Sequence, residues 1–431
     1  MLAFSKQNGF AYGLMGLPLA FVALPLYVIL PNHYAKAFGV PLATLGAILL
    51  GARLFDAAID PLLGRLSDRL FSRSIASVLA TGAASAAVLA AGFALLFFPQ
   101  VASPSALVTW ASVMLMVTYA AYSFLSVAHQ SWGAMLGGNE AERSGLVAWR
   151  EGLGLVGVVL ASVTPVALGL PATTAIFMVA LCLGWLAWTQ AVKPTPKTAA
   201  IADKSAMWRP FAHGNFKALL AVFMLNGIAS AVPATLVLFF IQDRLQAPAS
   251  MEPLFLGSYF LTAALSIPLW LFVVKRIGLA KTWLIGMGLS IAVFAWATQV
   301  GAGQTTAFLI ITSLSGIALG TDLTLPGAML AGDIQNNGDS GKSEGAYFGW
   351  WNFATKLNLA LAAGLALPLL GLAGYSPGAR GPDALNALVV AYCVLPCTLK
   401  LAAAAALYFL IIRPAQSLRS ISASSKTESL S

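Results

Sequence analysis

Apolar stretches long enough to cross a bilayer recur along most of this 431-residue sequence. A helix that crosses the hydrocarbon core needs about 20 mostly apolar residues. Twelve stretches meet this length, six on each side of a polar, proline-containing break that begins at Lys193. They are residues 9–30, 42–66, 74–98, 104–130, 144–170, 172–192, 216–242, 252–274, 281–300, 304–330, 343–371 and 384–412. The sequence therefore predicts an all-α membrane protein with twelve transmembrane helices in two six-helix bundles.

The composition and the distribution of charge narrow the class further. Hydrophobic residues make up 59% of the chain and charged residues 9%, which excludes a soluble globular protein. If the N-terminus is cytoplasmic, seventeen Lys and Arg residues face the cytoplasm and only three face the opposite side. This asymmetry predicts that both termini are cytoplasmic, and it accounts for the net charge of +9 without nucleic acid.

These observations divide the chain into four parts. We expect an N-terminal six-helix bundle at 1–192, a cytoplasmic linker at 193–215, a C-terminal six-helix bundle at 216–412 and a disordered cytoplasmic tail at 413–431. A basic segment after the second span has a partial echo after the eighth, as a six-plus-six duplication would produce. The two bundles are therefore expected to be pseudo-symmetric.

Two carboxylates lie inside the second expected span, where a charge costs roughly 3 kcal/mol or more. Asp56 and Asp60 are four residues apart, so they project from one helical face with Cβ atoms about 6 Å apart. Like charges this close favour sharing a proton or a metal ion. We therefore predict a site for a coupling cation, Na⁺ or H⁺, at this pair. A packing role for an Arg53–Asp56 pair is the alternative.

A lysine lies near the middle of the eleventh expected span. Lys356 requires a carboxylate partner at that depth, and the two acids of the second span are the candidates. Asn352 and Thr355, on the same helix, are expected to add neutral oxygen ligands to the cation site. A static salt bridge is the alternative for Lys356.

The remaining intramembrane charges are candidates for substrate binding. Arg150 either contacts Glu151 or binds anionic or hydroxyl groups of a substrate. Asp322 is a second protonation site, a substrate contact or the partner of Lys400. The aromatic residues predicted to line a substrate cavity are Tyr122, Trp132 and Trp351.

Several motifs resemble a known family. The pattern of Gly64, Asp68, Arg69 and Arg73 resembles the loop motif of the major facilitator superfamily (MFS) between helices 2 and 3. Within that superfamily, Arg53-x-x-Asp56-x-x-x-Asp60-Pro61-x-x-Gly64 is similar to the helix 2 signature of the melibiose permease-like glycoside–pentoside–hexuronide:cation symporters. Residues 267–278 and 328–345 also resemble family turns, and the resemblance covers nearly the whole chain.

The resemblance implies cation-coupled symport of a small organic solute by alternating access. It places the cation at Asp56 and Asp60 near Lys356, and it implies a gating role for Arg53 and for the loop motif. Two sugar-binding acids of the family are missing here, because Tyr12–Leu19 contains no acid and the helix 4 position falls near Ala128. A sugar or glycoside is therefore one candidate substrate, and an amphipathic lipid-like or aromatic molecule is the alternative.

Other function classes fit less well. The sequence contains no Gly-x-x-x-x-Gly-Lys-[Ser/Thr] loop and no sizeable soluble domain, so an ATP-driven pump or an enzyme is not expected. A membrane-embedded receptor of the same architecture would not need the paired acids. We expect a monomer in the inner or plasma membrane that has lipid and a small-molecule substrate as partners and no resident cofactor.

Overall fold

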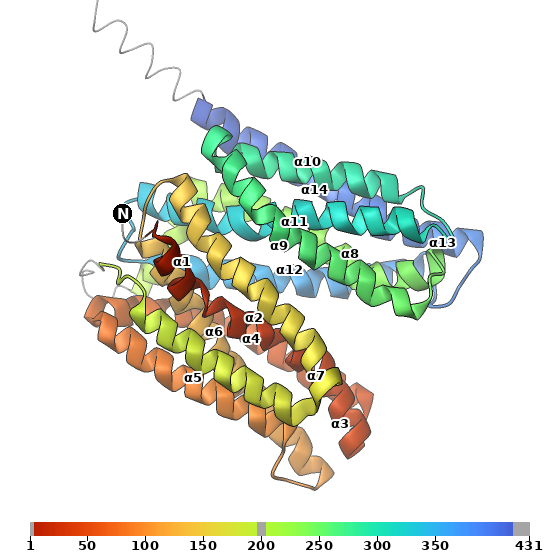
Figure 1. Cartoon of the computed structure of the whole chain (residues 1–431), viewed down its shortest axis with the longest axis horizontal. Helices are drawn as coiled ribbons and strands as arrows, with labels where there is room; N and C mark the ends of the chain where they lie inside the picture. Colours follow the sequence, from red (N-terminus) through yellow and green to blue (C-terminus); the bar gives the residue numbers. More distant parts are fainter. Residues whose placement is uncertain (1–3, 196–203, 417–431) are drawn as a thin grey trace, which may run out of the picture. The chain divides into compact units, whose positions relative to one another are not determined.

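The computed structural model describes residues 4–195 and 204–416, and every regular element in these ranges is a helix (Figure 1). The predicted all-α class is confirmed. The helices gather into two compact units, which are Met1–Ala212 with Ala331–Phe353, and His213–Leu330 with Ala354–Ser431. The end of α11 and the start of α12 thus group with the first unit, which the sequence did not indicate.

The first unit contains the elements from α1 to the short helix η3. They are α1 (Lys6–Gly13), α2 (Gly16–Phe21), η2 (Pro25–Ile29), α3 (Leu30–Phe38), α4 (Leu42–Arg73), α5 (Ile75–Phe97), α6 (Pro104–Met135), α7 (Glu140–Gln190) and η3 (Lys204–Ala212). The η3 helix occupies the second half of the predicted linker, and residues 196–203 lie outside the described part.

The second unit contains most of the remaining elements. They are α8 (Gly214–Phe239), η4 (Phe240–Arg244), η5 (Ala249–Met251), α9 (Glu252–Ile277), α10 (Leu279–Ala297), α11 (Thr305–Asn336), α12 (Glu344–Leu372), α13 (Pro382–Val389), η6 (Val390–Val394), α14 (Leu395–Leu407) and η7 (Tyr408–Ile412). Residues 413–416 continue as helix. The predicted disordered tail therefore starts too early, and residues 417–431 lie outside the described part.

Most of these helices can span a bilayer. Within the described residues, nine helical segments are long and apolar enough to cross one. The α4 and α12 helices, of 32 and 29 residues, have lengths of about 48 and 44 Å at 1.5 Å per residue. Both lengths exceed the ~30 Å hydrocarbon core. Together these helices make the chain a multi-pass membrane protein.

The fifth and sixth expected spans meet without a loop. The 51 residues of α7 form two helical arms that meet at Gly169, whose φ of 79° lies in the left-handed region. Glycine adopts this conformation without the steric penalty that a Cβ would bring. Pro171 follows two residues later and begins the second arm of the helix. One glycine therefore replaces the connection expected between 170 and 172.

Glycines also allow α2 and α7 to approach closely in the first unit. A Cβ at Gly16 would lie 2.3 Å from the carbonyl oxygen of Arg150, and a Cβ at Gly157 would lie 2.1 Å from that of Leu17. Both distances are well below van der Waals contact. This packing fixes the segment of α7 that carries Arg150.

The η3 helix packs against residues that follow α11. Arg209 forms a 2.6 Å ion pair with Asp339, whose side chain is fully buried. Its Nε also donates a hydrogen bond to Oδ1 of Asp339, and this bond raises the pKa of the Arg209 guanidinium. Tyr347 also donates to Asp339, at 2.9 Å. The indole of Trp350 donates to the carbonyl oxygen of Met207 at 2.9 Å. The start of α12 is therefore tied to the linker within the first unit.

Candidate functional site

The two acids of α4 lie in the interior of the structure. Asp56 is 1% exposed and Asp60 is fully buried, one helical turn apart. Burying an ionised carboxylate costs several kcal/mol unless charges or hydrogen bonds compensate it. The prediction that both acids share a buried helical face is consistent with this placement.

A hydroxyl from α6 reaches the first of these acids. Ser123 is 1% exposed, and its Oγ donates to Oδ1 of Asp56 at 2.7 Å. Short hydrogen bonds to a charged acceptor are among the stronger ones in proteins. The sequence analysis did not select Ser123. Its only signal was a hydroxyl in the middle of an apolar helix, and such residues are common.

Proline adds a further oxygen near the acids. Pro61 lies inside α4, directly after Asp60. Because proline has no N–H, it cannot donate the helical hydrogen bond to the carbonyl of residue i−4, which is Ala57. That carbonyl lies between the two acids in sequence. Oxygen ligands of these kinds, carboxylate, hydroxyl and freed carbonyl, are those that suit a hard monovalent cation.

Arg53 contacts aromatic residues of the first unit. Its guanidinium lies 4.2 Å from the centroid of the Tyr27 ring, which is within the range of a cation–π interaction. The Tyr27 ring lies 5.9 Å from that of Tyr119, on α6. Arg53 precedes Gly64 by eleven residues, about 16 Å along the helix axis. The structure therefore does not bring Arg53 together with the other predicted gating residues.

The last turns of α4 contact the start of α12. Asp68 accepts hydrogen bonds from the backbone N–H groups of Gly345 and Ala346, at 2.6 and 2.9 Å. These are among the first N–H groups of α12, which have no partners within the helix. A carboxylate also stabilises the positive end of the helix dipole. Asp68 therefore caps α12 within the first unit.

Gly64 brings the two backbones together one turn before this cap. A Cβ at Gly64 would lie 2.1 Å from the carbonyl oxygen of Gly345, and a Cβ at Gly345 would lie equally close to that of Gly64. Arg69 and Arg73 are exposed at the end of α4, which remains helical through Arg73 instead of turning within the motif. The gating role of the two arginines stays a prediction.

We expect Gly64→Ala to lower the midpoint of thermal unfolding, because the added methyl must push α4 and α12 apart. Overpacking of this kind costs about 1–3 kcal/mol. Gly51→Ala, also in α4, is the control, because a Cβ there meets nothing within 4 Å. Gly51→Ala should leave the free energy of unfolding unchanged or raise it by up to about 1 kcal/mol. Equal unfolding midpoints for the two purified variants would contradict the backbone contact.

The predicted substrate residues of the first unit lie in different environments. Arg150 donates to Oε1 of Glu151 at 2.6 Å, so the contact between these neighbours is formed. Tyr122 is partly buried on α6. Trp132 is fully buried, and its indole donates to the carbonyl oxygen of Val192 at 3.0 Å. The burial of Trp132 and its hydrogen bond to the backbone indicate that this side chain packs within the bundle and does not bind substrate.

The predicted α12 residues fall on both sides of the boundary between the two units. Trp351 and Asn352 belong to the first unit, whereas Thr355 and Lys356 belong to the second. Trp351 is 6% exposed, Asn352 and Lys356 are partly buried, and Thr355 is exposed. Their proximity to the acids of α4 therefore stays a prediction.

The second unit contains a buried ion pair. Nζ of Lys400, on α14, lies 2.8 Å from Oδ2 of Asp322, on α11. Of the three roles considered for Asp322, the structure therefore shows the pairing with Lys400. Lys400 also donates to Oδ1 of Asn226 at 2.9 Å. Asp322 accepts from the indole of Trp283 at 2.8 Å and from Ser230 at 3.3 Å. Side chains from three other helices, α8, α10 and α14, thus converge on Asp322.

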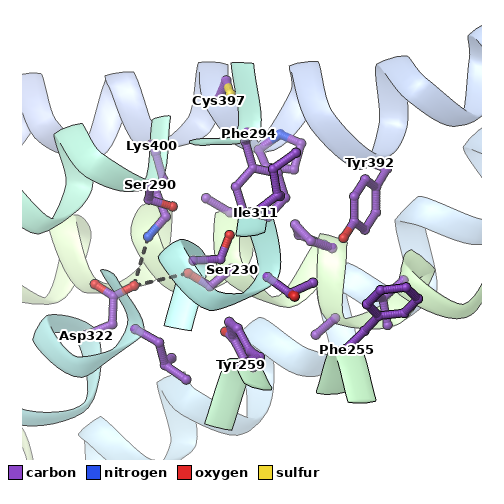
Figure 2. A pocket seen from close by; sticks show the side chains of 18 of the residues that line it. Ser230, Phe255, Tyr259, Ser290, Phe294, Ile311, Asp322, Tyr392, Cys397 and Lys400 are labelled. Atoms are coloured by element: carbon purple, nitrogen blue, oxygen red, sulfur yellow. Dashed lines mark hydrogen bonds and ion pairs between the residues drawn. The ribbon is translucent and has the colours of Figure 1, made fainter. Parts of the chain in front are cut away.

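This ion pair lines a cavity of about 350 Å³ within the second unit (Figure 2). The volume is at the lower end of the range for small-molecule sites. Rings of Phe255, Tyr259, Phe294 and Tyr392 line it, while Asp322 and Lys400 meet together at one side. The sequence analysis identified Asp322 but missed these aromatic residues, which do not differ in sequence from packing aromatics.

Metal-binding clusters were also considered. Over residues 4–195 and 204–416, no group of three or more His, Cys, Asp or Glu side chains is arranged to hold a metal ion. The oxygen set at Asp56 and Asp60 has only two carboxylates. Carboxylate oxygens are hard ligands, and tightly held transition metals are more often bound by imidazole or thiolate.

Sequence comparisons find similarity to transport proteins. A family model described as MFS/sugar transport protein matches residues 9–413. The uncharacterized symporter YjmB of Bacillus subtilis strain 168 is 24% identical over 409 residues, which cover 88% of this chain and 85% of YjmB. The putative glycoside/cation symporter YagG of Escherichia coli K12 is 26% identical over 159 residues, or 36% of this chain and 34% of YagG.

Solved structures share the fold. A bacterial homologue of the iron transporter ferroportin, in an outward-facing state, has a TM-score of 0.71 at 14% identity and covers 94% of this chain and 99% of its own. A single-residue variant of the E. coli fucose:proton symporter FucP has a TM-score of 0.68 at 16% identity, with coverages of 93% and 99%. At these identities the likeness concerns the fold alone.

Proposed function

Because this chain belongs to the MFS/sugar transport protein family, we propose that it is a cation-coupled symporter of a small organic solute. The family match confirms the predicted MFS fold and makes the chain a membrane transporter, not an enzyme. The curated relatives include a symporter and a putative glycoside/cation symporter. The proposal adds the coupling site, the cation and the class of solute.

The observation that carries the proposal is the buried acidic pair of α4. Asp56 and Asp60 are almost completely shielded from solvent, and Ser123 donates to Asp56. Intramembrane carboxylates are costly, so they usually serve an ion pathway or a binding site. We assign the coupling cation, Na⁺ or H⁺, to this pair, with the Ser123 hydroxyl and the Ala57 carbonyl as neighbouring oxygens.

Coupling then follows from linked binding. If cation and solute each increase the affinity for the other, the doubly loaded transporter is favoured over either singly loaded form. Alternating access requires that the empty and doubly loaded forms exchange between outward and inward states more readily than singly loaded forms. The downhill flow of the cation then drives uptake of the solute without ATP.

The class of solute has two candidates. A sugar or glycoside is supported by the family description and by the name of the partial relative YagG. An amphipathic lipid-like or aromatic solute is supported by the absence of acids in Tyr12–Leu19 and by Ala128 near the expected helix 4 acid position. We also propose cytoplasmic termini, because Lys and Arg concentrate on that side, and a monomer without a resident cofactor.

The proposed function is tested in proteoliposomes that contain the purified protein. Uptake of labelled glycosides and aromatic solutes is measured with an inward Na⁺ gradient, with an inward proton gradient, and with neither. We expect accumulation above the external concentration under one of the two gradients. Equal inside and outside concentrations of every solute under both gradients would reject symport of these solute classes.

Lys356→Ala is expected to change the cation dependence of transport. The family resemblance implies that Lys356 lies near the cation site, and an ammonium there would compete with the cation for carboxylates, so its removal should alter the Na⁺ or H⁺ concentration that gives half-maximal uptake by several-fold. Lys281→Ala, an exposed lysine at the start of α10, is the matched control. A cation dependence identical to the parent would leave only a packing role for Lys356.

A further inference from the structure

The cavity of the second unit has one polar side on a mainly apolar lining (Figure 2). The charged side consists of Asp322 and Lys400, with Ser230 and Ser290 nearby, and the hydroxyl-bearing side chains of Tyr259, Thr312, Ser315 and Tyr392 also line the cavity. Aromatic rings and aliphatic side chains form most of the remaining lining. This arrangement lies wholly within the second unit and is separate from the acidic pair of α4 in the first unit.

Lys400 retains one hydrogen-bond donor. An ammonium carries three N–H groups. Among the described residues, Nζ donates to Asn226 and to Asp322, which uses two of them. Lys400 is only 5% exposed and lines the cavity, so the third N–H is left with little exposure to solvent. A ligand atom in the cavity that accepts a hydrogen bond would satisfy it.

Asp322 has a complementary acceptor position. A carboxylate offers about four acceptor positions. Trp283, Ser230 and Lys400 occupy three of them. A hydroxyl group can accept from Lys400 and donate to Asp322 at the same time. A carboxylate ligand would accept from Lys400 but would lie beside the negative charge of Asp322.

The lining and the volume of the cavity indicate the chemical character and the size of the ligand. Its rings favour an aromatic ligand that makes edge-to-face or offset contacts. The volume of about 350 Å³ accommodates roughly a dozen non-hydrogen atoms if each needs the ~30 Å³ that a water occupies. A hexose has a similar size, but all of its hydroxyls would need partners on a lining that is mainly apolar, and each group left unsatisfied costs about 1–3 kcal/mol.

We infer that this cavity binds a small uncharged aromatic alcohol or phenol, with its hydroxyl group between Lys400 and Asp322 and its ring among the aromatic side chains. This assigns a second ligand site to the chain and deepens the proposed function by naming a solute class. The role of the site in transport rests on the proposed function. Binding itself does not.

The test is equilibrium binding to the full-length protein in lipid nanodiscs, without any gradient. The probes are 4-ethylphenol, ethylbenzene, 4-ethylbenzoate and glucose. We expect saturable binding of 4-ethylphenol at least tenfold tighter than binding of each of the other three. Equal or tighter binding of ethylbenzene would identify the cavity as a general apolar site, open to lipid chains, and would overturn the inference. So would preferred binding of 4-ethylbenzoate or glucose.

Two variants locate the bound probe. Ala234→Trp places a large ring in the cavity from an exposed position of α8 and should weaken 4-ethylphenol binding at least tenfold. Ala221→Trp is the matched control, because Ala221 is exposed on the same helix and does not line the cavity. Unchanged binding to the Ala234→Trp variant would overturn the assignment.

A third variant tests the role of the ion pair. The double substitution Asp322→Asn with Lys400→Met keeps the site neutral and should bring the affinities for 4-ethylphenol and ethylbenzene within about twofold of each other. A preserved tenfold preference would exclude the proposed hydroxyl position. Failure of the transport proposal is distinguishable, because a protein that accumulates no solute but binds 4-ethylphenol in this cavity would reject symport alone.

Discussion

Replacing Asp60 with asparagine is expected to reduce solute accumulation from about tenfold to about onefold under a tenfold inward gradient of the coupling cation. With one cation per solute and no membrane potential, a tenfold gradient supplies about 1.4 kcal/mol, enough for tenfold accumulation. Asparagine keeps the size of the side chain but removes the charge that we propose binds the cation. Without coupling, the solute only equilibrates. The measurement is the ratio of internal to external labelled solute in proteoliposomes.

The same result is expected for Asp56→Asn. The asparagine oxygen can still accept from Ser123, so the hydrogen bond to α6 and the fold should persist. Asp383→Asn, at an exposed position in the first turn of α13, is the control and should accumulate solute like the parent. Parent-like accumulation by both α4 variants, with unfolding midpoints near that of the parent, would remove the acidic pair from the coupling mechanism.

The helices and the buried acidic face follow from sequence because their determinants are local. The lengths of the apolar stretches specify spans, and the four-residue spacing of Asp56 and Asp60 specifies one helical face. The break expected between 170 and 172 lies within two residues of the kink in α7, but hydropathy does not show that a single glycine with a positive φ makes it. Gly169, whose backbone angles are not helical, joins the two helical arms of α7.

The partners of the polar residues did not follow from sequence because they are distant along the chain. Ser123 lies 67 residues from Asp56, and Lys400 lies 78 residues from Asp322. The cost of a buried charge predicts that a partner exists, but it does not select one. For Asp322 the sequence therefore left three roles open.

Aromatic residues posed a related difficulty. Trp132 was expected to bind substrate, yet it packs against Trp188 at 5.5 Å between ring centroids and its indole nitrogen is satisfied by backbone. Tyr392, which lines the cavity of the second unit, was not selected. Burial and lining depend on which neighbours a helix face meets, and hydropathy alone does not contain that information.

Breaking the Asp322–Lys400 ion pair of the second unit is expected to cause a large loss of stability. Lys400→Met is expected to destabilise the protein by about 3–5 kcal/mol, because it leaves Asp322 buried without its counter-charge. Asp322→Asn should be similarly destabilising, since it leaves the ammonium of Lys400 buried. The side chains of the pair are only 13% and 7% exposed, so water compensates little of either loss. The measurement is the midpoint of thermal unfolding of the purified variants.

The double variant distinguishes a charge effect from a packing effect. Asp322→Asn combined with Lys400→Met removes both charges, while asparagine still accepts from Trp283 and Ser230. Replacing a buried ion pair by neutral groups is often close to neutral in stability, so the double variant should unfold near the parent and above either single variant. Lys281→Met, at an exposed position, controls for the loss of a lysine. If the two single losses simply add, the residues are not coupled, and the pair is no more than two adjacent packing positions.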